Sequence, residues 1–166
     1  MSYDLDAFPL PPGVPVDEFM ESGGRERLAE DDSPPSAEER AAMERAAEAL
    51  LAVDPAAERA DGDDWIEING EAMQVSLYAR EAAITIPYWG GDADAIMARA
   101  FEYARVLNET LGYTIWDPQT GAVVDLDAPD RDAAASRFSD ISSRMDEIAA
   151  TSPPQPPRRP WWKIWG

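Results

Sequence analysis

The alternation of apolar and polar residues along the chain predicts an antiparallel sheet. Residues 3–8, YDLDAF, alternate as a strand that the following prolines end. Residues 65–89, WIEINGEAMQVSLYAREAAITIPYW, show three successive runs of alternation. Asn69-Gly70 is a strong hairpin signal, because both central positions of a type I′ turn need positive φ. Pro87 lacks an amide hydrogen and belongs at a strand end or an edge.

Two more strands are expected later in the chain, on either side of a short turn. Residues 113–117, YTIWD, are rich in β-branched and aromatic side chains. The segment PQTG then has the composition of a turn, and residues 122–126, AVVDL, read as a returning strand. The consecutive runs therefore favour antiparallel neighbours.

Three stretches show the periodicity of amphipathic helices. Ser36 and Glu39 form a capping box ahead of a helix over about 37–52. The clearest pattern runs over 92–112 and ends at Gly112. A third helix over about 131–149, with Asp130 as its N-cap, has one apolar stripe. The apolar faces of the last two helices consist of Ile96, Ala100, Tyr103, Ala104, Leu107 and Leu111, and of Phe138, Ile141, Met145 and Ile148.

The order of these elements predicts an α+β fold. Strands come in consecutive runs with helices between the runs, which favours a mainly antiparallel sheet of about five to six strands with two to three helices packed on one face. Residues 9–35, rich in Pro, Gly and acids, are expected to form an irregular loop with at most one helical turn. Residues 1–150 then form a single acidic domain. Residues 151–166, a Pro-rich spacer and a Trp-rich end, form what we call the tail.

Charge separates the tail from the domain. The net charge of −19 divides into −22 for residues 1–150 and +3 for the tail, which has no acid. Such a negative domain disfavours direct contact with nucleic acid or anionic lipid. The sequence MSYDLDAF is acidic and is not typical of a signal peptide, and the longest apolar run, 82–89, is too short to cross a bilayer. A cytoplasmic protein is the default expectation.

The absence of cysteine and histidine narrows the possible chemistry. Catalytic triads, imidazole or thiolate metal sites and disulfides are excluded. The acidic clusters at 61–64 and 125–132 lack the EF-hand spacing, and the Gly-Gly pairs lack a phosphate-loop pattern, so neither a metal nor a cofactor is expected. Carboxyl candidates for catalysis, Asp4, Asp6, Glu67 and Asp117, are most simply explained as a solvated sheet face and turn chemistry.

Aromatic residues gather on or beside the predicted sheet. Core packing is the simplest explanation for them. Those on an uncovered face would instead form a protein-binding surface amid acids. The candidates for that surface are Trp65, Tyr88, Trp89 and Trp116.

Two short motifs give the chain a family resemblance. MSYDL at the start and IWDPQ at 115–119, the latter following a helix that ends in LNETLG, are similar to those of a family of small acidic bacterial proteins with an MSYDL strand and a YDPQ-like strand end. The resemblance implies a cytoplasmic α+β domain whose first strand lies beside the YTIWD strand. The family has no established activity, so the resemblance assigns no role to Tyr3, Asp4, Asp117 or Gln119. The 9–35 segment and the tail depart from its pattern.

The tail can be interpreted in three ways. Its prolines favour an extended spacer. The segment that follows can dock on its own domain, serve as a linear anchor for a partner protein, or lie at an anionic membrane surface, which the acidic domain would oppose. The residues that would make these contacts are Arg158, Arg159, Trp161, Trp162, Lys163, Ile164 and Trp165.

Our leading functional hypothesis is a non-enzymatic acidic binding or regulatory module, such as an immunity-type protein or an adaptor, with a protein partner that can be basic. The alternative from another class is a carboxylate-dependent hydrolase, which requires two convergent acids, one with a strongly raised pKa. A weaker alternative is a nucleic-acid mimic that competes for a DNA-binding protein. The sequence leaves the identity of the partner and the oligomeric state open.

Overall fold

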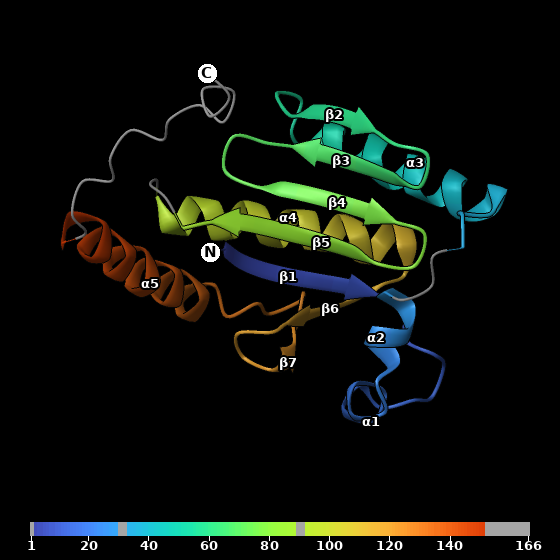
Figure 1. The fold of residues 1–166 in the computed structure, drawn as a ribbon, viewed down its shortest axis with the longest axis horizontal. Helices are drawn as coiled ribbons and strands as arrows, with labels where there is room; N and C mark the ends of the chain where they lie inside the picture. Colours follow the sequence, from blue (N-terminus) through green and yellow to red (C-terminus); the bar gives the residue numbers. More distant parts are fainter. Residues whose placement is uncertain (1, 30–32, 89–91, 152–166) are drawn as a thin grey trace, which may run out of the picture.

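An antiparallel sheet of seven strands organises the fold in a computed structural model, which describes residues 2–29, 33–88 and 92–151 (Figure 1). The strand order is β2-β3-β4-β5-β1-β6-β7, and every neighbouring pair is antiparallel. The expected α+β fold is thus confirmed. The strands are β1 (Ser2–Phe8), β2 (Glu58–Asp61), β3 (Trp65–Asn69), β4 (Gln74–Tyr78), β5 (Ala82–Pro87), β6 (Thr114–Asp117) and β7 (Ala122–Val123).

Two long helices cover one face of this sheet, and a third packs beside them and extends past the end of the sheet. They are α3 (Ala37–Val53), α4 (Ala93–Leu111) and α5 (Arg131–Thr151), and α4 packs between the other two (Figure 1). The capping box of Ser36 and Glu39 is present, and Gly112 ends α4 with a φ of 70°. Asp130 accepts a hydrogen bond from the amide of Ala133 at the start of α5. Local signals in the sequence therefore marked these helix ends correctly.

The main core lies between the sheet and the three helices. Alternate residues of the central strands, such as Leu5, Ile84 and Leu77, are fully buried on this side. The apolar face of α4 meets them, with Ala100, Tyr103 and Leu107 at 0% exposure. This burial fixes the register, because a shift by one residue would turn each strand's apolar side chains to the opposite face.

Residues 9–35 are more regular than the loop that we expected. The described part of this segment, 9–29 and 33–35, contains two six-residue helices, α1 (Val16–Glu21) and α2 (Gly24–Ala29), near the end of β1 (Figure 1). The Phe19 ring of α1 stacks on Phe8 of β1 with 5.4 Å between centroids, and Trp116 completes this second core. Such short helices depend on tertiary packing, which the Pro- and Gly-rich composition concealed.

Close packing in this second core makes Gly24 sensitive to substitution. A Cβ atom added there would lie 2.4 Å from the Phe19 ring. Gly24→Ala should lower the free energy of unfolding by about 2 kcal/mol through this overlap, measured by chemical denaturation followed by circular dichroism. Phe19→Leu removes the ring, so the double variant should lose less than the sum of the single losses. Additive losses would show that the overlap is not the cause.

Two local predictions about the sheet were wrong. Gly70 does not have positive φ, because β3 and β4 are joined by a four-residue loop, closed by a 2.9 Å hydrogen bond from the Gly70 amide to the Met73 carbonyl, and not by a type I′ turn. Residues 58–61 form the edge strand β2, although no strand was predicted between residues 53 and 64. The strand lacks the apolar alternation that predicts strands, because its residues on the helix side, Arg59 and Asp61, are polar. Their side chains form an ion pair with 2.6 Å between nitrogen and oxygen.

Candidate functional site

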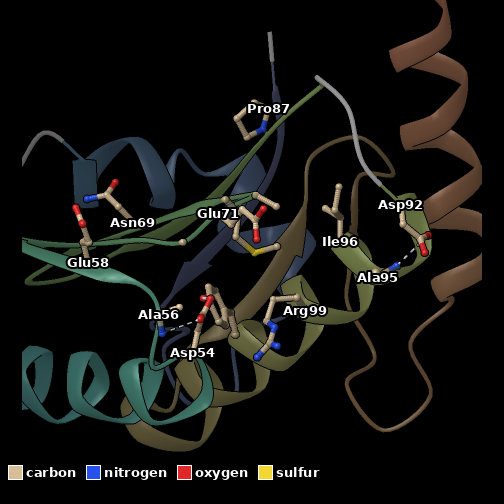
Figure 2. Close-up of a pocket in the computed structure, with 14 residues that line it drawn as sticks. Asp54, Ala56, Glu58, Asn69, Glu71, Pro87, Asp92, Ala95, Ile96 and Arg99 are labelled. Atoms are coloured by element: carbon tan, nitrogen blue, oxygen red, sulfur yellow. Dashed lines mark hydrogen bonds between the residues drawn. The ribbon is translucent and has the colours of Figure 1, made fainter.

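A cleft of about 750 Å³ lies at one end of the sheet (Figure 2). Its walls are the end of α3, the β3–β4 loop, the end of β5 and the first turns of α4. The volume falls within the range of small-ligand and peptide side-chain pockets. The site is built where connections meet, so its residues come from segments far apart in the sequence.

One wall of the cleft contains a hydrogen bond between two side chains. The Tyr103 hydroxyl of α4 donates a 2.7 Å hydrogen bond to Oδ2 of Asp54, which follows α3. Burial, and then this bond, raise the pKa of Tyr103. A Cβ atom added at Gly70 would lie 3.2 Å from both partners, so glycine lets the β3–β4 loop approach them. Asp54 is thus held in place by its neighbours.

The cleft is acidic, with Arg99 as its one cationic lining residue. The guanidinium of Arg99 donates a 2.8 Å hydrogen bond to the Val53 carbonyl and lies 3.3 Å from the Glu102 carboxylate. It therefore closes the last turn of α3 and is already engaged. The four acidic lining residues are Asp54, Glu58, Glu71 and Asp92.

The four acids differ in whether their carboxylates already take part in hydrogen bonds or ion pairs within the domain. Asp92 caps α4 by accepting bonds from the amides of residues 94 and 95, and Asp54 is held as described. Among residues 2–29, 33–88 and 92–151, Glu58 and Glu71 form no ion pair. Both are exposed at the rim. These two carboxylates are the ones available to a cationic ligand.

Apolar side chains line the rest of the cleft. Met73 and Ile96 are 4% and 8% exposed, and Pro87 at the end of β5 lies beside them in the lining. Figure 2 shows Ile96 and Pro87 directed into the same space as Glu71. The arrangement combines an apolar wall with carboxylates at the rim, which suits a ligand that is both apolar and cationic.

A second, smaller pocket of about 100 Å³ lies on the opposite face of the sheet, between β1, β4 and α2. Asp6 in its wall is 8% exposed and lies 2.9 Å from the Arg25 guanidinium, while its Oδ2 atom has no hydrogen-bond partner among the residues that the structure describes. Burial raises the pKa of Asp6, and Arg25 opposes this. Glu81 also lines the pocket. The volume is well below that of ordinary ligand pockets, which gives a hydrolase little room for substrate.

The two motifs of the family resemblance meet in the structure. Strands β1 and β6 are neighbours, as expected, and the buried Tyr3 hydroxyl donates a 2.7 Å hydrogen bond to Asp117. The Gln119 amide donates to the other oxygen of Asp117 at 2.8 Å. With its amide nitrogen turned inward, the Gln119 side chain also donates to that oxygen and to the Asp4 carbonyl. The contacts join β1 to the β6–β7 turn.

No family model, curated protein or solved structure matches the chain. Membership of the family of small acidic bacterial proteins, which the MSYDL and IWDPQ motifs suggest, therefore stays a prediction.

The aromatic residues suggested as a partner-binding surface occupy different environments. Trp65 is partly exposed and pairs across the strands with Tyr78, which is 39% exposed. Tyr88 is buried against Phe138 with 5.2 Å between ring centroids, so it belongs to the core. Trp116 is 9% exposed in the second core. Trp89 and the tail residues from Arg158 to Trp165 lie outside the described residues.

Ion pairing explains one acid of the cluster at 61–64, namely Asp61. Asp61 contacts Arg59 and Arg40, and hydrogen bonds from Arg59 lower its pKa. Arg40 also donates to the carbonyls of Gly62 and Asp63. In the described part of the chain, no group of three acids is placed to hold a metal ion, and none of the helices there has the length and apolarity that crossing a bilayer requires.

Proposed function

We propose that the chain is a non-enzymatic acidic binding module that takes up a basic segment of a partner protein in the cleft. The observation that carries this proposal is that Glu58 and Glu71, at the rim, form no ion pair with any residue that the structure describes, while Arg99 in the lining is engaged by Val53 and Glu102. A lysine or arginine side chain of a partner would form ion pairs with those carboxylates. An immunity-type protein or an adaptor would act in this way on a basic target.

The remainder of the domain supports this proposal through its charge. A net charge of −22 over residues 1–150 attracts a basic partner over distances of about 10 Å at moderate salt. Long-range attraction raises the association rate, whereas the paired contacts at the rim would slow dissociation. A nucleic-acid mimic would use the same field, but it needs no cleft with an apolar wall.

The proposal is tested with a fluorescein-labelled peptide of alternating lysine and leucine, added to the full chain and followed by fluorescence anisotropy. Glu58→Gln with Glu71→Gln should weaken binding about fivefold, equivalent to about 1 kcal/mol for two partly exposed contacts. Higher salt should weaken binding to the unsubstituted chain further.

The matched control is Glu109→Gln with Asp140→Gln, which removes the same charge from exposed positions on α4 and α5 outside the cleft. It should leave the dissociation constant within twofold of the original. Equal weakening by both double variants would mean that the peptide responds to net charge alone. That result would refute the cleft as the binding site.

A further inference from the structure

The helix α5 ends at the same end of the molecule as the cleft. In Figure 1, the last turn of α5, the start of α4 and the end of β5 all lie on the left, and α5 packs against α4. Figure 2 shows α5 passing close to Asp92, at the edge of the cleft. Thr151 is the last residue of α5, so the tail begins from this end of the molecule.

The chain that follows Thr151 is chemically complementary to the cleft. Residues 152–166 contain three basic side chains and no acid. The cleft offers Glu58 and Glu71, which form no ion pair within the described part of the chain, beside an apolar wall. The large apolar side chains of this segment are Trp161, Trp162, Ile164 and Trp165. Tryptophan and arginine are the residues that most often dominate binding energy at protein interfaces.

The length of the spacer permits this contact. Nine residues, 152–160, separate Thr151 from Trp161, and five of them are proline. At about 3.1 Å per residue an extended Pro-rich segment reaches about 30 Å. This reach matches the length of α5, whose 21 residues span about 30 Å at about 1.5 Å each, so the segment can run back along α5 toward α4, against which that helix packs. A short tether also gives an effective concentration of the order of millimolar.

We propose that residues 158–165 of the tail dock in the cleft of their own chain, with tryptophan against the apolar wall and the basic residues at Glu58 and Glu71. The tail then competes with the partner's basic segment, so that a partner binds only when it displaces the tail. This inference rests on the proposed function of the cleft. A second copy of the chain could supply the same tail, which the experiment distinguishes.

Docking is measured directly with a bimane label, whose fluorescence is quenched by nearby tryptophan. Because the chain has no cysteine, Ala56→Cys places one label in the lining of the cleft, and Glu109→Cys places a control label at the far end of α4. Replacing Trp161, Trp162 and Trp165 by phenylalanine in the full chain should at least double the emission at position 56. It should leave the emission at position 109 unchanged.

Two results would overturn the proposal. Equal emission at position 56 with and without the three tryptophans would show that the tail does not reach the cleft. Quenching that disappears on dilution from micromolar to nanomolar protein would show that the tail comes from a second copy. Quenching that is independent of concentration supports docking within one chain.

Competition separates this proposal from the proposed function. With the three tryptophans replaced, the lysine–leucine peptide should bind about tenfold more tightly, because the weakened tail competes less for the cleft. Cleft-dependent peptide binding without quenching at position 56 would leave the proposed function standing and refute tail docking. Quenching at position 56 without peptide binding would leave tail docking standing and refute the capture of a separate basic segment.

Discussion

Asp117→Ala is expected to lower the free energy of unfolding by about 3 kcal/mol. The carboxyl group accepts hydrogen bonds from the buried Tyr3 hydroxyl and from the Gln119 amide, and Asp117 is 6% exposed. Its removal leaves buried donors without an acceptor, and each such donor costs about 1–3 kcal/mol. The loss also frees the β6–β7 turn from β1. Chemical denaturation of the full chain measures the effect.

The matched control for this prediction is Asp125→Ala. Asp125 also accepts hydrogen bonds from two backbone amides, those of residues 127 and 128, but it is exposed. Water can replace those bonds, so the loss should stay below about 0.5 kcal/mol. Tyr3→Phe should cost about 1 kcal/mol, because it removes one donor and leaves the backbone contact. Similar losses at residues 117 and 125 would show that burial of the contact is not what matters.

Alkaline pH is expected to unfold the chain steeply above about pH 10. Burial raises the pKa of all five tyrosines, and the bonds to Asp117 and Asp54 raise those of Tyr3 and Tyr103 further. In the unfolded chain they lose protons near pH 10. The protonated tyrosines therefore contribute their full share to the free energy of unfolding below pH 10. This contribution is lost as pH rises, by about 1.4 kcal/mol per pH unit for each buried tyrosine.

The composition makes this titration unusually clean. The chain has a single lysine, and arginine stays charged in this range, so tyrosine dominates between pH 9.5 and 11. Tyrosinate absorbance should appear together with the loss of helical circular dichroism, and not as a gradual titration of the folded chain. Tyr113→Phe should make the loss of stability with pH less steep, whereas Tyr78→Phe, at a 39% exposed position, should change it little. Gradual ionisation without unfolding would contradict the prediction.

Sequence patterns predicted the elements whose signals are local. The capping box at Ser36, the αL glycine at residue 112 and the alternation in β4 and β5 each depend on residues a few positions apart, and each was correct. The helices α1 and α2 were missed because their stability comes from Phe8 and Trp116, which are distant in sequence. Strand β2 was missed because it lies at an edge and has no buried face.

The cleft was not predictable from the sequence for a similar reason. Asp54, Glu71 and Arg99 lie in separate connections or helix turns. The chain has 33 acids, so many pairs of acids lie close in sequence by chance and a functional pair cannot be distinguished from them. One signal was present at Tyr103, which falls on the apolar face of a predicted helix. A buried tyrosine hydroxyl usually finds a polar partner, and following that requirement would have led to Asp54.

The position of β1 between β5 and β6 has a consequence for biosynthesis. This strand leaves the ribosome before both of its neighbours, which are residues 82–87 and 114–116. At about 5–20 residues per second, the wait for β5 alone lasts roughly 4–16 s. During that time β1 has no strand to pair with and its apolar side stays uncovered. Strands β2 to β5 are consecutive neighbours in the sheet, so they can pair with one another as they are synthesised. The acids at residues 4 and 6 on its other side would then act as charges that discourage pairing with neighbouring nascent chains.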